Sequence, residues 1–255
     1  MEPVYDRICA KIDLDALKSN LSVIRGNVPD GVKLLAVVKA NAYGHGSKKI
    51  AGFLHDNVDM FGVAGIYEAI ELRKAASAWT AVSEDICGKP VLVLGHTPVG
   101  LYEEALAARI SLTIYNSEEA ELLSEAAVNM GVGANIHIAV DTGMGRIGFY
   151  PDEKSADTVA CIAKLPGIRI EGVFSHYAAS DEADKTLSIR QKELFDKFSG
   201  MLKARDVTPE IYHISNSAAI MELEESCDMV RAGIVLYGLY PSEEVKKEGF
   251  PLKPV

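Results

Sequence analysis

Six polar residues lie at or just after the ends of short apolar segments in this 255-residue chain. They supply an amine, an imidazole, an amide, a hydroxyl and two guanidinium groups: Lys39, His176, Asn216, Ser217, Arg146 and Arg231. An amine can form a covalent bond with a carbonyl group or move a proton. Guanidinium groups bind carboxylates and phosphates. The set therefore predicts an active site for an anionic ligand, provided that the fold brings the residues together.

Each residue also has an ordinary structural explanation when it is taken alone. A lysine at the end of a strand usually extends into water, and a lone histidine there is more often a satisfied, partly buried group. Asn216 or Ser217 could cap a helix, and Arg231 could belong to a structural ion pair. The joint placement of all six at the ends of five different strands is what favours a site.

Eight short apolar, β-branched runs bounded by turn residues predict eight strands. They are residues 34–39, 60–65, 91–95, 111–115, 135–140, 170–176, 211–215 and 229–234. Several are apolar on both faces, as parallel strands covered by helices are. Strands recur roughly every 20 to 40 residues, as repeated βα units do. The predicted fold is α/β, a (β/α)8 TIM-type barrel with its active site where strands run into the following loops. A doubly wound sheet is the alternative.

Helical patterns lie between the predicted strands. Asp13 is placed to cap the first helix, and Asn116 or Ser117 to open another that ends at Gly131. Apolar residues recur at helical spacing in the first helix and in residues 185–204. The predicted buried stripes are Leu14, Leu17, Leu21 and Ile24 in the first, and Leu187, Leu194, Phe198 and Met201 in the second.

The composition excludes several classes of protein. The net charge of −10 opposes general affinity for nucleic acid or an anionic membrane surface. No apolar run is long enough to span a bilayer, and the N-terminus lacks the apolar core of a signal peptide. The four cysteines form no C-x-x-C pair, which indicates reduced thiols in a cytoplasmic protein and no zinc site.

The segment GMGRIG, residues 143–148, matches the glycine pattern of dinucleotide-binding loops. That motif belongs in the first βα turn of a Rossmann unit, where it opens a long apolar helix. Here Phe149, Tyr150 and Pro151 follow it instead. We interpret the glycines as a close-packed loop that presents Arg146.

Five longer motifs together resemble the alanine racemases, enzymes of fold type III that depend on pyridoxal phosphate. They are AVVKANAYGHG (36–46), DTGMGRIGF (141–149), SHYAASDEADK (175–185), HISNSAA (213–219) and VRAGIVLYG (230–238). Their order and spacing match from Ile12 to the last residues, LKPV. Other lysine-bearing barrels of this fold share the architecture but not this set of motifs.

The resemblance implies a role for each candidate residue. Lys39 carries pyridoxal phosphate as a Schiff base and serves as one of two acid/base groups. The phosphate is held by side chains and backbone amides near the last two strands: Tyr43, Ser217, Gly233 and Ile234, with Asn216 close by. Arg146 approaches the ring hydroxyl and the substrate, His176 braces the ring, and Arg231 faces the ring nitrogen.

The implied function is interconversion of L- and D-alanine by removal and return of the α-proton, which supplies D-alanine for peptidoglycan. A serine racemase of the same family and a non-catalytic barrel that carries pyridoxal phosphate are the alternatives. A sugar-phosphate enzyme would leave Arg231 and the motif AYGHG unexplained. In the family, a position equivalent to Ala139 commonly holds a lysine that orients the arginine, so the placement of Arg146 depends here on something else.

The family acts as a homodimer, in which a tyrosine from the partner's C-terminal β domain is the second base. This chain stops where that domain would begin. We therefore expect residues 1–239 to form the cofactor-binding barrel and residues 240–255 to be a connector toward an absent C-terminal β domain. The expected consequence is that this polypeptide alone binds pyridoxal phosphate but racemises poorly.

Overall fold

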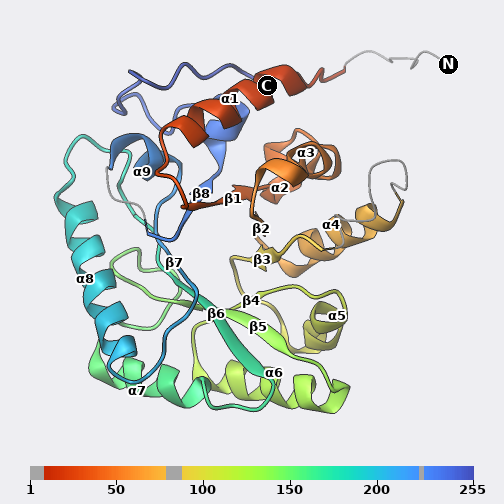
Figure 1. Cartoon of the computed structure of the whole chain (residues 1–255), viewed down its shortest axis with the longest axis vertical. Helices are drawn as coiled ribbons and strands as arrows, with labels where there is room; N and C mark the ends of the chain where they lie inside the picture. The colour runs from red at the N-terminus through yellow and green to blue at the C-terminus, as the bar shows by residue number, and fades with distance from the viewer. Residues whose placement is uncertain (1–8, 79–87, 224–226) are drawn as a thin grey trace.

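Eight parallel strands alternate with helices around one barrel in the computed structural model, which describes residues 9–78, 88–223 and 227–255 (Figure 1). The strands are β1 Lys33–Val37, β2 Met60–Val63, β3 Val91–Val93, β4 Leu112–Ile114, β5 Ala134–Ala139, β6 Ile168–Phe174, β7 Ile211–His213 and β8 Met229–Ala232. Every predicted strand is present, and its ends lie within about two residues of the prediction.

Helices surround the strands on the outside of the barrel (Figure 1). The α-helices are α1 Leu14–Gly26, α2 Lys39–Tyr43, α3 Ser47–Leu54, α4 Ile66–Ala78, α5 Tyr102–Ala107, α6 Ser117–Met130, α7 Glu153–Ile162, α8 Thr186–Lys203 and α9 Ser217–Glu222. Short 3-10 helices occur at η1 His55–Asn57, η3 Val99–Leu101 and η4 Ile234–Tyr237.

The strand order shows that the sheet closes on itself. Hydrogen bonds join the strands into two runs, β3-β2-β1-β8 and β4-β5-β6-β7, and all of these pairs are parallel. A bridge between Leu92 and Ser111 links β3 to β4. On the other side, the Arg231 amide donates to the Ser215 carbonyl over 3.0 Å and so links β7 to β8. The prediction of a barrel is confirmed, and the doubly wound alternative is wrong.

The barrel contains an inner apolar cluster and a set of buried polar residues. Alternate residues of a strand face opposite directions, and in β1 Leu34 and Ala36 pack against the helices while Leu35 and Val37 face inward. The inner apolar cluster comprises Leu35, Val37, Met60, Leu92, Ile211 and Met229. The buried polar residues in or next to strands β4 to β8 include Ser111, Thr113, His137, Glu171, His213 and Arg231.

The predicted helix ends are confirmed. The Asp13 carboxylate accepts from the amides of Asp15 and Ala16 at the start of α1. Asn116 caps α6, and Gly131 ends that helix in the left-handed conformation, with φ of 65°. Each contact satisfies backbone groups that a helix end would otherwise leave unpaired.

The predicted buried stripes are partly wrong. Leu17, Leu21 and Ile24 of α1 are buried as expected, but Leu14 is 37% exposed because it lies in the first turn, at the helix end. In α8 only Phe198 of the predicted stripe is buried, and Leu187 is 39% exposed. The buried face of α8 consists of Ser188, Gln191, Phe195, Phe198 and Leu202. Because Ser188 and Gln191 on this face are polar, the periodicity of apolar residues does not identify it.

The last residues of the chain lie along α1 (Figure 1). The Asn20 side chain is buried there and donates to the carbonyls of Leu236 and Lys253, while its oxygen accepts from the Lys253 amide. One helix residue thereby fixes the C-terminal segment to the barrel. Of the sequence features noted above, residues 1–8 and Cys87 lie outside the described residues. None of the helices in the described ranges is long and apolar enough to cross a membrane.

Candidate active site

A cavity of about 540 Å³ opens where the strands run into their following loops. All nine residues singled out from the sequence line it: Lys39, Tyr43, Arg146, His176, Asn216, Ser217, Arg231, Gly233 and Ile234. Three of them are cationic side chains, and Asp181 is the one carboxylate among the described residues of the lining. An acidic protein thus concentrates positive charge at this opening, which suits an anionic ligand.

The sequence predicted that Lys39 would be the last residue of the first strand. In the structure it lies beyond the end of that strand. Strand β1 ends at Val37, and Lys39 begins α2, whose next four residues, 40–43, have φ between 49° and 55°. This is a left-handed turn, which disfavours residues with a side chain by roughly 1–2 kcal/mol each. Nothing in the sequence ANAY indicates such a turn, because glycine is the residue that usually adopts it.

The left-handed turn is held in place by Glu68 of α4. One carboxylate oxygen accepts from the Ala40 amide and the other from the Ala64 amide, each over 2.7 Å. The loops after β1 and β2 are thereby joined directly beside Lys39. Glu68 is a positioning residue that the sequence analysis missed, since an acidic residue near a helix start is ordinary.

Two tyrosines and a histidine pack behind the lysine. The rings of Tyr43 and Tyr237 lie 5.1 Å apart, and His45 stacks on Tyr237 at 4.7 Å. The Tyr237 hydroxyl donates to the carbonyl of Val37 over 3.0 Å. Burial raises the pKa of the Tyr43 hydroxyl, so this group remains a hydrogen-bond donor at neutral pH.

A small cup forms where Tyr43, Ser217 and Gly233 meet. The Gly233 amide donates to the Ser217 hydroxyl over 3.0 Å. A methyl group added at Gly233 would lie 2.8 Å from the Tyr43 hydroxyl and 3.4 Å from the Ser217 hydroxyl. The absence of a side chain therefore leaves a space that two hydroxyl groups close, next to the backbone of Ile234 at the start of η4. The two hydroxyl groups are donors of the kind that bind a phosphate group.

Asn216 acts both as a helix cap and as a link between loops. Its side-chain oxygen accepts from the Ala219 amide in α9 and from the Ser180 hydroxyl in the loop after β6, over 3.0 and 2.8 Å. Both interpretations of this residue are therefore compatible, because the cap places it on the wall of the cavity.

Arg231 is buried and has only neutral hydrogen-bond partners. Its guanidinium donates to the carbonyls of Ser175, His213 and Ile214. It also donates to the Nδ1 atoms of two imidazoles, those of His213 and His176, each over 3.0 Å. Burial, and to a lesser degree Arg146, lowers the pKa of Arg231 to about 10, so the side chain stays charged at neutral pH. The structural ion pair considered above is not formed by the described residues.

His176 is a neutral imidazole in this environment. Burial lowers its pKa to about 3, and the charges of Arg231, Arg146 and Lys39 act in the same direction. Because an arginine can only donate, the Nδ1 atom of His176 accepts, and the hydrogen resides on Nε2. The ring therefore offers an N–H donor, and it lines the cavity.

Arg146 lies on the exposed loop after β5. The Asp141 carboxylate accepts from the amides of Gly143 and Gly145 and so closes the turn. Gly148 has φ of 135°, and a side chain there would lie 2.4 Å from the Asp141 amide. Gly148 is therefore closely packed as we expected, whereas Gly145 has no atom within 4 Å of an added methyl group and is needed for its left-handed conformation, with φ of 69°. Ala139 is buried, and no hydrogen bond from a described residue reaches the Arg146 guanidinium.

Gln191 of α8 is a further residue that the sequence analysis missed. Its amide group donates to the His176 carbonyl over 2.9 Å and to the Thr142 hydroxyl over 3.3 Å, while its oxygen accepts from the Ala178 amide. These contacts join the loops that carry Arg146 and His176. The signal for Gln191 is weak in the sequence, because a glutamine within a charged helix is normally exposed.

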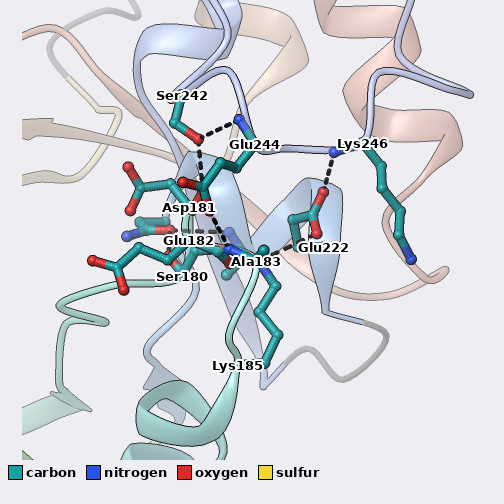
Figure 2. Close-up of polar contacts among 11 residues, drawn as sticks. Ser180, Asp181, Glu182, Ala183, Lys185, Glu222, Ser242, Glu244 and Lys246 are labelled. Carbon is teal, nitrogen blue, oxygen red and sulfur yellow. Dashed lines mark hydrogen bonds and ion pairs between the residues drawn. The ribbon is translucent and has the colours of Figure 1, made fainter.

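The rim of the cavity is held by the segment after β8. Figure 2 shows Ser242 donating to the Asp181 carbonyl and the Ala183 amide donating to the Glu244 carboxylate, both over 2.6 Å. Glu222 of α9 accepts from the Lys246 amide and pairs with Lys185 at 3.2 Å. The segment after β8 and helix α9 thereby both fix the loop after β6, which contributes Asp181 to the lining.

The fold and the cavity define an α/β barrel enzyme scaffold with a lysine and a cup lined by two hydroxyl groups at its opening. No group of His, Cys, Asp and Glu in the described ranges could hold a metal ion. The family model of the alanine racemase N-terminal domain matches residues 12–241. The chain belongs to this family.

Relatives and solved structures agree with this assignment. The alanine racemase of Clostridium tetani is 45% identical over 100% of this chain and 62% of its own length, and that of Clostridium perfringens is 44% identical over 97% and 62%. The solved alanine racemase of Clostridium difficile in complex with cycloserine has a TM-score of 0.89 at 38% identity, over 94% of this chain and 64% of the solved one. The alanine racemase of Bacillus anthracis with bound L-Ala-P has a TM-score of 0.87 at 31% identity, over 99% and 63%. The chain thus spans about 62% of the length of the curated relatives it matches.

Proposed function

We propose that this chain binds pyridoxal phosphate in the cavity and takes part in the interconversion of L- and D-alanine. The observation that carries the proposal is the placement of Lys39, the buried Arg231 and the Gly233 cup around one opening. The sequence similarity to alanine racemases supports the substrate assignment. A serine-preferring racemase of the same family would use the same barrel residues.

The donors of the cup would hold the phosphate. The hydroxyls of Tyr43 and Ser217 and the backbone at Gly233 and Ile234 surround a space that a side chain would fill. These groups lie at the loops near the last two strands, where barrels bind phosphate. Asn216 supports the cup by capping α9, whose first residue is Ser217.

Arg231 would face the ring nitrogen of the cofactor, and His176 would pack beside the ring. A guanidinium is donor-only and charged at neutral pH. It therefore disfavours a second positive charge at a nitrogen beside it. His176 adds no charge, because its pKa is far below neutrality. Arg231 and His176 therefore both offer N–H donors to the cofactor, and His176 carries no additional proton.

When it is bound, pyridoxal phosphate withdraws electrons from the α-carbon of an amino acid and makes its proton acidic. Lys39 would hold the cofactor covalently until substrate displaces its amine, and would then move the proton at one face of that carbon. Racemisation requires a second base at the opposite face. The family resemblance assigns this role to a tyrosine of the C-terminal domain of the partner subunit.

Arg146 would hold the substrate and the ring hydroxyl from the loop after β5. Its exposed position and its lack of hydrogen bonds to the described residues leave the guanidinium available for a ligand. We further propose that residues 1–239 form the cofactor-binding barrel and residues 240–255 a connector, in a cytoplasmic homodimer whose substrate is a small amino acid.

Absorbance of the purified chain tests the proposal. We expect a yellow protein with added pyridoxal phosphate, and borohydride should fix the cofactor to the peptide that contains Lys39. The Lys39→Ala variant should remain colourless after gel filtration. The Lys49→Ala variant is the matched control, because Lys49 is exposed on α3 and does not line the cavity.

A colourless parent protein in the presence of excess cofactor would refute the proposed cofactor. Racemase activity is tested separately, by exchange of the α-proton of L-alanine in heavy water. A protein that binds the cofactor at Lys39 but exchanges no proton, even when it is combined with the C-terminal domain of an alanine racemase relative, would instead be a non-catalytic carrier.

A further inference from the structure

A row of buried polar side chains extends from Arg231 into the interior of the barrel. Arg231 Nη1 lies 3.0 Å from His213 Nδ1, and His213 Nε2 lies 2.9 Å from His137 Nδ1. His137 Nε2 lies 3.2 Å from the Glu171 carboxylate, to which Ser111 also donates over 2.8 Å. His137 and His213 are completely buried, and Glu171 is 9% exposed. Only Arg231 of this row lines the cavity.

The two ends of the row, donor-only Arg231 and the acceptor Glu171, set the direction of its hydrogen bonds in the same sense. Arginine can only donate, so His213 Nδ1 accepts and its hydrogen must be on Nε2. That hydrogen is donated to His137 Nδ1, which places the His137 hydrogen on Nε2 as well. His137 then donates to Glu171. Both imidazoles are therefore neutral Nε2–H tautomers, and all hydrogens point from the arginine toward the carboxylate.

An irregularity of the sheet brings Glu171 under His137. Strand β5 pairs with β6 so that Ile136 faces Ile170 but His137 faces Gly172, which leaves Glu171 as an extra residue, a β-bulge. A methyl group at Gly172 would lie 2.4 Å from His137 Nδ1. The glycine therefore provides the space for the imidazole, and the bulge turns the adjacent carboxylate inward. Both features serve the same contact.

The carboxylate at the end of the row remains ionised. Burial raises the pKa of Glu171, whereas the hydrogen bonds that its carboxylate accepts from His137 and Ser111 favour the ionised form and lower the pKa. At the other end, the hydrogen-bond partners of Arg231 are carbonyls and imidazoles without charge. Glu171 is thus the anionic end of a row whose cationic end faces the cavity.

Two aromatic contacts keep the row aligned. The Phe174 ring stacks on His213 at 5.1 Å with an angle of 19° between the planes, and the Arg231 guanidinium lies over the same ring at 5.7 Å. Neither contact determines which nitrogen of His213 carries its hydrogen. Only the hydrogen-bond partners at the two ends do so.

We propose that Glu171 and His137 are positioning residues for Arg231: acting through His213, they fix the direction in which the guanidinium donates into the cavity. The neutral imidazoles separate Glu171 from the cavity, so this carboxylate orients the arginine without contacting the ligand. A carboxylate in direct contact would compete with the ligand for the same donors. This inference rests on the proposed function only in assigning the cofactor to Arg231.

The hydrogen positions can be measured directly in the protein without cofactor. Nitrogen-15 NMR of histidine-labelled protein distinguishes Nδ1–H from Nε2–H tautomers. We expect the Nε2–H tautomer for both His137 and His213, assigned with the His137→Gln and His213→Gln variants. An Nδ1–H tautomer at either residue in the parent protein would overturn the proposal, and this measurement requires no binding of pyridoxal phosphate.

Two substitutions at Glu171 separate positioning from packing. Glu171→Gln keeps an oxygen that can accept from His137, so we expect unchanged tautomers and an affinity for pyridoxal phosphate within about threefold of the parent. Glu171→Leu removes the acceptor. We expect a mixture of tautomers at His137 and an affinity at least about tenfold weaker, since unpaired buried donors drive rearrangement.

Gly172→Ala provides an independent variant, because it displaces the His137 ring without removing any polar group. It should reproduce the tautomer mixture of Glu171→Leu. If either folded variant retains the parent tautomers, or if Glu171→Leu binds the cofactor as tightly as the parent, the proposal is wrong. If the parent protein binds no pyridoxal phosphate, the proposed function is wrong. The tautomers of His137 and His213 would still test the direction of the hydrogen bonds in the row.

Discussion

Arg231 Nη2 donates to His176 Nδ1 over 3.0 Å, and both side chains line the same cavity. The contact requires a neutral His176 with its hydrogen on Nε2. Protonation at Nδ1 would place two donors face to face next to a buried cation. The pair therefore links the charge state of the cavity to the stability of the protein at mildly acidic pH.

We predict that His176 makes the folded protein sensitive to acid. The ordinary pKa of a histidine is 6.5. In the folded state the pKa of His176 is lowered to about 3, chiefly because of burial. Between these values the unfolded state binds the proton and the folded state does not, so stability is lost as the pH falls from 6.5 toward 3. His176→Gln, which can still accept from Arg231, should reduce this dependence. Relative to the variant, the parent should lose about 2 kcal/mol of unfolding free energy between pH 6 and pH 4.

Urea denaturation at several pH values measures this difference. Carboxylates elsewhere change the unfolding free energy with pH equally in both proteins. Only the difference between the two curves therefore reports on His176. Parallel curves for the parent and His176→Gln between pH 6 and pH 4 would contradict the prediction. The control is Lys49→Gln, an exposed substitution on α3 outside the cavity lining, whose curve should follow that of the parent protein.

Much of the fold was predictable because it depends on local patterns of apolar residues. The strands are short apolar runs, and the caps at Asp13 and Asn116 use the side chains that helix starts prefer. The positions of candidate residues followed from the barrel, since parallel strands all end on one face. For this reason Lys39 and Arg231, which are nearly two hundred positions apart, could be placed at one opening from the sequence alone.

The features that escaped prediction depend on tertiary contacts. The left-handed turn after Lys39 has no glycine, so its conformation is imposed by Glu68 and the surrounding packing. The bulge at Glu171 depends on pairing between strands. Gln191 is buried only because α8 presents it to two loops. Periodicity of apolar residues contains no information about any of these contacts.

We predict that Gln191→Leu destabilises the protein and loosens the cavity. The substitution leaves the part-buried Ala178 amide and His176 carbonyl and the buried Thr142 hydroxyl without this partner, and a buried group that loses its partner costs about 1–3 kcal/mol. We expect a total loss of about 3 kcal/mol of unfolding free energy by chemical denaturation. Lys197→Ala, an exposed substitution on the same helix, should change it by less than about 0.5 kcal/mol. Equal effects of the two variants would show that Gln191 does not hold the loops.

We predict that Gly233→Ala impairs cofactor binding far more than folding. The added methyl group would lie 2.8 Å from the Tyr43 hydroxyl and would occupy the cup. The affinity for pyridoxal phosphate, measured by absorbance titration, should fall at least about tenfold, or ~1.4 kcal/mol. Gly100→Ala is the matched control, since a methyl group there meets no atom within 4 Å. An unchanged affinity in Gly233→Ala would exclude this cup as the phosphate site.

We predict that Glu222 stabilises the rim of the cavity through two different segments. Its carboxylate is almost fully buried, pairs with Lys185 at 3.2 Å and accepts from the Lys246 amide. Glu222→Ala removes both contacts and should cost about 2 kcal/mol of unfolding free energy, because a hydrogen bond to a charged group contributes about 1.5–3 kcal/mol. Hydrogen exchange at the Lys246 amide should become faster in the folded protein, since that amide loses its acceptor.

The exposed pair of Glu243 and Lys247 provides the control for this prediction. The two side chains lie 3.1 Å apart, but Glu243 is 96% exposed, and such pairs contribute little in water. Glu243→Ala should therefore leave hydrogen exchange at the Lys246 amide unchanged, although it is closer in sequence. Suppose that Glu243→Ala accelerates that exchange as much as Glu222→Ala does. The segment that contains Lys246 would then be held by its own local charges. The Glu222 carboxylate would not connect this segment to the loop that contributes Asp181 to the cavity.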